Sequence, residues 1–214
     1  MQPYGGTEIQ FDYLKKYCSN HWDSVQITTS VPEKEPLHPV RSNILWLKNS
    51  FDQPNIAPWF SNPKNHTKYD WYVFNSHWNY EKFRYMFKLE SPNCLVIKNG
   101  IDYEELVVKK KQEKKDKIKL VYFSTPWRGL EVLLNSMEQL KDEKNITLDV
   151  YSSTQIYGDA FKEANDKHYL KLYEKAKQLP NVNYMGYCQH KDLLAKLHEY
   201  DANIFPSIWE ETFC

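Results

Sequence analysis

Residues 118–130 read IKLVYFSTPWRGL, and this stretch decides the fold that the sequence predicts. Its first six residues form an apolar run with the length of a buried strand. An amphipathic helix follows, with apolar residues at positions 130, 133, 134, 137 and 140. The turn between them holds one cation, Arg128, beside Gly129. A strand that leads through a short turn into a helix is the unit from which parallel α/β sheets are built.

The same alternation continues on both sides of this unit. Further strands are predicted at residues 25–29, 42–47, 71–74, 94–97, 146–151, 182–185 and 202–205. Further helices are predicted at residues 7–18, 78–87, 161–179 and 193–200. The proline- and asparagine-rich stretch that runs to Lys68 is expected to be irregular. Short apolar strands alternating with helices predict an α/β fold with parallel sheets covered by helices on both faces.

A basic run at residues 108–119, VKKKQEKKDKIK, divides the chain into two halves and is expected to be an exposed linker or a solvated helix face. The sequence therefore predicts two Rossmann-like domains, residues 1–103 and 104–214. Only four residues precede Gly5, where a doubly wound domain should have a strand, so the first strand is expected to be missing. In such sheets, ligands bind beyond the carboxyl ends of the strands.

Composition excludes several classes of protein. Twenty-eight basic and 28 acidic residues give zero net charge, so there is no electrostatic reason to expect nucleic acid as a partner. No apolar run reaches the roughly 18 residues of a membrane helix, and we expect no signal peptide, because the first residues hold no apolar stretch. Peripheral membrane contact stays open. Four scattered cysteines predict reduced thiols and a cytoplasmic location. Cys188 and His190 have no second pair of ligands nearby in sequence, so no metal site is expected.

Two strand-to-helix turns have the composition of anion sites. Gly5-Gly6-Thr7-Glu8 allows a close backbone approach at a helix N-terminus, which suits a phosphate; the alternative is a plain turn with Thr7 as N-cap. At residues 123–130, Arg128 presents a planar fork to phosphate oxygens beside a helix start. The alternative there is a surface arginine that flanks the helix. Residues 151–158 could also line a nucleotide pocket through backbone groups.

The closing segment, residues 203–214, carries paired acids after a strand. A carboxylate at Glu210 or Glu211 can accept hydrogen bonds from sugar or ribose hydroxyls. The alternative is a helix start that is capped by Ser207 or Thr212, with the acids in its first turn. Three further acids are expected to be turn or cap residues: Asp70, Asp102 and Asp201.

Taken in order, four stretches resemble the large GT4 family of retaining glycosyltransferases, which have the GT-B fold. They are similar to the family's glycine-rich loop, to the V-I-P-N-G-V-D run that closes its first domain, to the K/R-G-L that opens a helix of its second domain, and to its F-x-G and A-D…P-S…E-x-F-G runs. In this sequence the four stretches are residues 5–8, 96–102, 128–130, and 184–186 with 202–213.

The resemblance implies a nucleoside-diphosphate sugar as donor, held mostly by the second domain, and a carbohydrate or glycolipid acceptor on the first. It implies no metal cofactor, because a cation neutralises the diphosphate, and Arg128 matches that cation. Glu211 matches the first Glu of the family's E-x7-E motif, which faces the donor sugar, and is the expected catalytic residue. Transfer of hexosyltransferase type would pass through an oxocarbenium-like sugar with same-face attack. The expected donor-binding residues are Arg128, Gly129, Ser124, Glu210, Thr212, Phe213, Ser152 and Tyr157.

The sequence also departs from the family pattern. A second cation before the helix is not seen near Phe123 and Ser124, and Lys48-Asn49 stands where the family often has a histidine. The second Glu of the motif would fall beyond Cys214, so we expect a fragment, incomplete at both ends, that turns over little. Two other functions stay open: a sugar-nucleotide epimerase of the same fold, and a non-catalytic sugar- or nucleotide-binding module.

Overall fold

The computed structural model describes residues 4–90, 92–105 and 116–213 and consists of two compact units. The N-terminal unit contains residues 6–101 together with residues 210–213, and the C-terminal unit contains residues 102–209 together with residues 4 and 5. The closing residues, which the sequence places in the second domain, thus group with the first half of the chain. Most of the basic run at 108–119 lies outside the described residues.

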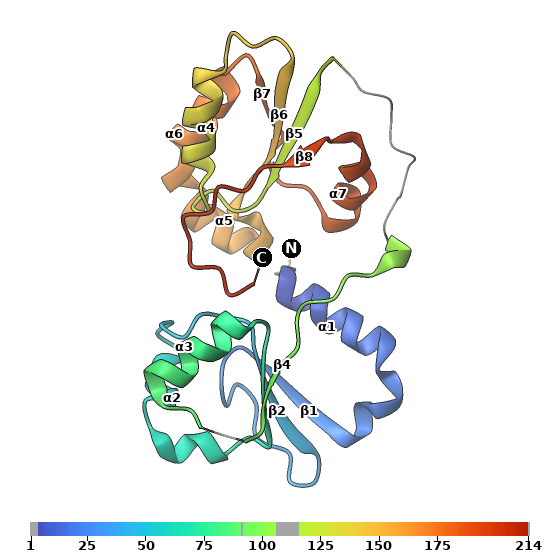
Figure 1. Ribbon diagram of the computed structural model, residues 1–214, viewed down its shortest axis with the longest axis vertical. Helices are drawn as coiled ribbons and strands as arrows, with labels where there is room; N and C mark the ends of the chain where they lie inside the picture. The colour runs from blue at the N-terminus through green and yellow to red at the C-terminus, as the bar shows by residue number, and fades with distance from the viewer. Residues whose placement is uncertain (1–3, 91, 106–115, 214) are drawn as a thin grey trace. The chain divides into compact units, whose positions relative to one another are not determined.

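The N-terminal unit is built on four parallel strands in sequential order, β1-β2-β3-β4. Helix α1 lies on one side of this sheet, and α2 and α3 lie on the other (Figure 1). The elements are α1 (Gly6–Tyr17), η1 (Ser19–Ser24), β1 (Val25–Thr29), β2 (Ser42–Leu47), α2 (Ala57–Phe60), η2 (Pro63–Thr67), β3 (Trp71–Phe74), α3 (His77–Phe87) and β4 (Cys94–Val96), where η marks a 3-10 helix.

An aromatic core holds α2 and α3 against this sheet. Phe60 of α2 is fully buried and makes edge-to-face contacts with Tyr72 of β3 and Phe83 of α3, at centroid distances of 6.1 and 4.8 Å. Leu45 and Leu47 of β2 are also fully buried in this cluster. Each large side chain that leaves water here contributes about 1.5–3 kcal/mol, which outweighs the irregular sequence around α2.

The C-terminal unit is built on four parallel strands in the order β7-β6-β5-β8. Helices α4 and α6 cover one face of this sheet and α7 lies on the other (Figure 1). The elements are η3 (Tyr103–Glu105), β5 (Ile118–Phe123), α4 (Leu130–Gln139), β6 (Ile146–Tyr151), η4 (Thr154–Tyr157), α5 (Asp159–Asn165), η5 (Asp166–Tyr169), α6 (Leu170–Gln178), β7 (Val182–Tyr184), α7 (His190–Lys196), η6 (Leu197–Glu199) and β8 (Ala202–Asn203).

The order of the C-terminal strands reverses at β5. The chain winds from β5 through β6 to β7 in one direction and then places β8 on the opposite side of β5. In doubly wound sheets, such a reversal leaves a crevice beyond the carboxyl ends of the two strands that flank it, and ligands bind there. The loops that follow β5 and β8 are therefore expected to form a ligand site.

Two sequence predictions of local structure are wrong. The helix predicted over residues 161–179 is divided into α5, the 3-10 helix η5 and α6, and the carboxylate of Asp166, the first residue of η5, accepts hydrogen bonds from Thr154 and Tyr173. The stretch before Lys68 was expected to be irregular, yet it contains α2 and η2. Of the acids expected to act as turn or cap residues, Asp102 accepts from the nearby Glu104 N–H. The carboxylates of Asp70 and Asp201 instead accept from the N–H groups of Asn43 on β2 and Lys119 on β5, far away in the chain.

Candidate functional site

The loops after β5 and β8 meet at Gly129. This glycine has φ +96°, and a Cβ atom built on it would lie 1.9 Å from the carbonyl oxygen of Pro206. No other residue type fits, since a side chain would collide with backbone and the positive φ is itself unfavourable. Gly129 therefore allows residues 205–207 to pack directly against the start of α4, at the strand-order reversal.

The N-terminus of helix α4 lies at this site and has no side-chain cap. Gly129 is its N-cap residue and supplies no side-chain hydrogen bond. The first N–H groups of a helix carry a partial positive charge and attract anions. Arg128, which immediately precedes Gly129, is half-buried, and its backbone N–H donates to the carbonyl of Thr125 at 3.1 Å. The Tyr122 hydroxyl donates to the same carbonyl at 2.8 Å. These two hydrogen bonds fix the backbone of the turn, so the residue that directly precedes the N-cap of α4 is a cation.

The loop after β6 forms the neighbouring part of the same sheet edge. Ser152, Ser153 and Thr154 are buried there. Asp166 holds the loop, because its carboxylate accepts from the Thr154 N–H at 2.8 Å and from the Ser153 hydroxyl at 3.0 Å. Burial opposes ionisation of Asp166, but the hydrogen bonds from Thr154, Tyr173 and Ser153 outweigh it and hold its pKa below the usual value. The loop is therefore preorganised by an ionised carboxylate.

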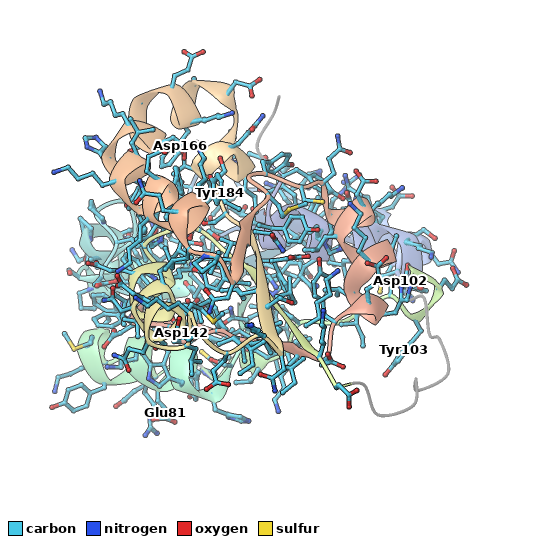
Figure 2. All side chains as sticks on the ribbon, turned by 90° about the horizontal axis from the view of Figure 1, so that it is seen from above. Glu81, Asp102, Tyr103, Asp142, Asp166 and Tyr184 are labelled. Atoms are coloured by element: carbon cyan, nitrogen blue, oxygen red, sulfur yellow. The ribbon has the colours of Figure 1, made fainter. Side chains whose placement is uncertain are left out.

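Tyr173 and Tyr184 extend the support of this loop. The Tyr173 hydroxyl donates to Asp166 at 2.9 Å, and its ring stacks on that of Tyr184 with centroids 4.9 Å apart. The Tyr184 hydroxyl donates to the carbonyl of Ser152 at 2.8 Å. Asp166 and Tyr184 can be followed in Figure 2, where both are labelled. Four elements, β6, η5, α6 and β7, thus fix the position of residues 152–154.

An aromatic group stands beside Arg128. The ring of Trp127 stacks on Tyr157, with centroids 5.9 Å apart and planes at 18°, and Tyr157 also contacts Phe161. Tyr157 and Phe161 are 39% and 40% exposed, so they present apolar surface to solvent. Flat aromatic surface of this kind suits stacking against a planar or apolar ligand group.

Three buried hydroxyls at this edge have no hydrogen-bond partner among the described residues. They are Thr125 Oγ1, after β5, and Ser152 Oγ and Thr154 Oγ1, after β6. Buried polar groups are normally paired, so unpaired ones call for an explanation. Their place at the carboxyl ends of adjacent strands fits a site that holds polar ligand atoms.

In the N-terminal unit, Thr212 ties the closing segment to the ends of β2 and β3. Its hydroxyl donates to the carbonyl of Lys48 at 2.8 Å and accepts from the Asn75 amide at 2.9 Å. The Ser76 hydroxyl donates to the Thr212 carbonyl. Glu210 forms an exposed ion pair with Lys82 at 3.9 Å. The alternative expected for this segment, a capped helix, is wrong, because residues 207–213 form no helix.

The predicted donor-binding residues therefore belong to two units. Ser124, Arg128, Gly129, Ser152 and Tyr157 lie on the loops after β5 and β6 of the C-terminal unit. Glu210, Glu211, Thr212 and Phe213 belong to the N-terminal unit, where Glu211 and Phe213 are half-buried. A single donor site made from both groups stays a prediction.

The predicted phosphate loop, residues 5–8, lies at the start of α1. The helix begins at Gly6, so Thr7 is inside its first turn and is not the N-cap residue. A Cβ atom on Gly6 would meet nothing within 4 Å, so no close backbone approach requires a glycine there. Glu8 is exposed. The role of this loop in binding stays a prediction.

Sequence reasoning missed three residues of the C-terminal edge. Thr125 and Trp127 lie in the quoted turn itself, and their placement between a strand end and a helix start was the available signal. Asp166 had no signal, because it lies within a regular helical pattern and acts on a loop 12 residues earlier. In the described parts of the chain, no group of three or more histidine, cysteine, aspartate or glutamate side chains is arranged to hold a metal ion.

No protein-family model matches the sequence, and no curated protein matches it. Solved structures do match the fold. The structure of TarM gives a TM-score of 0.56 at 16% identity, covering 94% of this chain and 39% of that one. A glycosyltransferase from Rickettsia africae gives 0.59 at 14% identity, covering 96% of this chain and 56% of that one. HepE from Anabaena, in complex with UDP and glucose, gives 0.54 at 15% identity, covering 81% and 48%.

These likenesses define the class of fold. The chain has a GT-B-like α/β fold with two Rossmann-like units on parallel sheets, as the sequence predicted. It spans between 39% and 56% of the length of these three solved structures. None of the described helices combines the length and the apolar character that crossing a bilayer requires.

Proposed function

We propose that this chain acts in glycosyl transfer, moving a sugar from a nucleoside-diphosphate sugar to a carbohydrate or glycolipid acceptor with retention of anomeric configuration. The observation that carries the proposal is the edge at Gly129, where Arg128, the uncapped start of α4 and the backbone of Pro206 come together at the strand-order reversal. That arrangement suits a diphosphate. HepE, whose structure holds UDP and glucose, shares this fold.

The diphosphate would bind at Arg128 and the N–H groups that begin α4. A guanidinium offers paired donors to phosphate oxygens, and each charge-assisted hydrogen bond is worth about 1.5–3 kcal/mol. As the glycosidic bond breaks, negative charge grows on the departing phosphate, so a fixed cation stabilises the transition state more than the ground state. Because Arg128 and the helix supply this charge, the proposal needs no metal cofactor.

The remaining parts of the donor would use the neighbouring residues. The exposed face of Tyr157, stacked on Trp127, suits the planar base. The hydroxyls of Ser124 and Ser152 suit polar atoms of the nucleotide. Glu211 takes the role that the resemblance gives it, facing the donor sugar and stabilising the oxocarbenium-like centre. Thr212 supports this segment through its contacts to Lys48 and Asn75.

The test is a transfer assay with UDP- and ADP-linked sugars and a panel of carbohydrate and glycolipid acceptors. The proposal predicts slow release of nucleotide, in keeping with the low turnover expected of this chain, together with a glycosylated acceptor whose new linkage keeps the donor's anomeric configuration, read by proton NMR coupling constants. Glu211→Gln should lower the rate by roughly 100-fold or more. Glu81→Gln, which alters an exposed carboxylate on α3, is the matched control and should leave the rate unchanged.

The two other functions give different products. An altered or hydrolysed donor without a changed acceptor indicates an epimerase. Nucleotide or sugar binding with no chemical change indicates a non-catalytic module. Either result contradicts glycosyl transfer by this chain.

A further inference from the structure

Lys48 directly follows strand β2 and is buried, with only 8% of its surface exposed. It lies at the carboxyl end of the N-terminal sheet, where the loops after β3 and β4 also lie. Asn75 follows β3, and Asn99 follows β4 by three residues. Three polar side chains therefore come from the ends of three adjacent parallel strands, the edge at which open α/β sheets bind ligands.

The ammonium group of Lys48 makes two contacts. Its Nζ donates to Oδ1 of Asn99, and it lies 3.8 Å from the ring centroid of Trp46. Both partners are neutral. Within the described parts of the chain, no carboxylate lies within 4.0 Å of Nζ, although the segment that packs on Lys48 carries Glu210 and Glu211. Glu210 pairs instead with Lys82.

A buried cation with only neutral partners is costly. Charged groups inside proteins are normally paired with an opposite charge, and an unpaired one is left poorly compensated. The contacts with an amide oxygen and an aromatic face offset only part of the hydration free energy that the ammonium group loses on burial. Burial lowers the pKa of Lys48 to about 8, which agrees with this reading. Apolar residues would fill the same space without that cost, so we infer that the charge of Lys48 has a function.

We propose that Lys48 and Asn99 form a subsite for an anionic group, a carboxylate or a phosphate, on the acceptor substrate. The ligand's anion would supply the missing counter-charge, while the Asn99 amide orients the ammonium group toward it. The proposal rests on the proposed glycosyl transfer, in which the N-terminal unit takes the acceptor and the C-terminal unit takes the nucleotide. It narrows the acceptor to an acidic carbohydrate or an acidic glycolipid.

The donor diphosphate is the other source of negative charge that this edge could meet. The C-terminal unit already offers that group a cation and a helix N-terminus at Arg128 and α4. Lys48 stands on the other sheet, beside Asn99 and Trp46. We therefore assign its anion to the acceptor, and the experiment below separates the two sources.

The first measurement is the pKa of Lys48 by carbon-13 NMR of the lysine Cε, in chloride and in sulfate at equal ionic strength. Sulfate is the probe because it does not titrate near pH 8. Bound sulfate should raise the pKa of Lys48 by about one unit or more, since an opposite charge at close range favours the charged form. The exposed Lys64 on η2 is the internal control. A shift at Lys48 no larger than that at Lys64 overturns the proposal.

The second measurement compares variants. Lys48→Arg keeps the charge and should bind sulfate within about threefold of the parent, whereas Lys48→Met should bind it at least tenfold more weakly. Near-ultraviolet circular dichroism checks that each variant is folded. Sulfate binding by Lys48→Met equal to that of the parent contradicts the subsite.

The source of the anion is decided by titrating UDP and ADP into the parent chain and Lys48→Met. Affinities within about twofold of each other support the acceptor assignment. A tenfold loss of nucleotide affinity in Lys48→Met indicates that the subsite binds the donor, and it overturns the assignment to the acceptor. If neither nucleotide binds the parent, the proposed function fails, while the sulfate result still reports on the anion subsite itself.

Discussion

Gly129 and Pro206 are separated by 77 positions in the chain, yet the carbonyl oxygen of Pro206 occupies the space that a side chain on Gly129 would need. This contact joins the loop after β5 to the loop after β8, the two strands between which the order of the sheet reverses. It brings the backbone of the loop after β8 against the start of α4, beside Arg128. The candidate diphosphate site depends on that close approach.

Gly129→Ala should displace residues 205–207 and destabilise the C-terminal unit by about 2–4 kcal/mol, since it adds both a steric clash and an unfavourable φ. Hydrogen exchange of peptides from β5 and β6 measures the loss. Gly100→Ala is the control, because a Cβ there meets nothing within 4 Å, and its stability should match that of the parent. Equal protection in the two variants would contradict the contact.

Asp166→Asn should destabilise the loop after β6, because the carboxylate accepts hydrogen bonds from Thr154, Ser153 and Tyr173. A loss of roughly 1.5–3 kcal/mol is expected at pH 7. Asp142→Asn, which alters an exposed carboxylate after α4, is the control and should leave the unfolding free energy nearly unchanged. Urea denaturation with hydrogen exchange of residues 152–157 distinguishes the two.

The effect of Asp166 should also depend on pH. The folded pKa of Asp166 lies below its unfolded value, so its stabilisation is fully present above about pH 4 and is lost as the pH falls through the folded pKa. The difference in unfolding free energy between the parent and Asp166→Asn should therefore shrink in acid. A difference that stays constant from pH 6 to pH 2.5 would contradict an ionised Asp166.

Lys48→Met should stabilise the N-terminal unit at neutral pH. Burial lowers the pKa of Lys48 from 10.5 to about 8, so the unfolded chain binds more protons between these values and the parent gains stability as the pH rises through them. The variant should exceed the parent by up to about 3 kcal/mol at pH 7 and by clearly less at pH 9.5. Urea titrations at both pH values measure the difference in unfolding free energy between the variant and the parent. A difference that grows with pH would contradict a lowered pKa of Lys48.

Thr212→Val should weaken the attachment of the closing segment to the N-terminal unit. The hydroxyl joins Lys48 and Asn75, and its loss leaves two polar groups without that partner, at a cost of about 1–3 kcal/mol. Hydrogen exchange at residues 72–80 reports the change. Thr67→Val, on the exposed end of η2, provides the comparison and should behave like the parent.

The strands were predictable because their apolar runs are short and bounded by turn residues. Strands β1, β2, β3, β5 and β6 begin and end where the sequence predicts, and β4, β7 and β8 are shorter by one or two residues. Four residues at 57–60 could not be predicted as a helix, because α2 is held by burial of Phe60 among aromatic rings from β3 and α3 rather than by its own sequence.

The candidate site was predictable in part. A cation beside a glycine, between a strand and a helix, is a local pattern, and it led to Arg128 and Gly129. The reason that Gly129 must be a glycine is a contact with Pro206, which no local pattern contains. The membership of residues 210–213 in the N-terminal unit likewise depends on hydrogen bonds between Thr212 and residues more than 130 positions earlier.

Whether Arg128 binds a nucleotide is decided by calorimetric titration of UDP and ADP into the parent chain, Arg128→Ala and Arg84→Ala. Arg84 is exposed on α3, paired with Glu81, and serves as the matched control. The account predicts that at least one nucleotide binds the parent, that Arg84→Ala binds it equally well, and that Arg128→Ala binds it at least tenfold more weakly. Binding by Arg128→Ala equal to that of the parent, or no binding of either nucleotide to the parent, would contradict it.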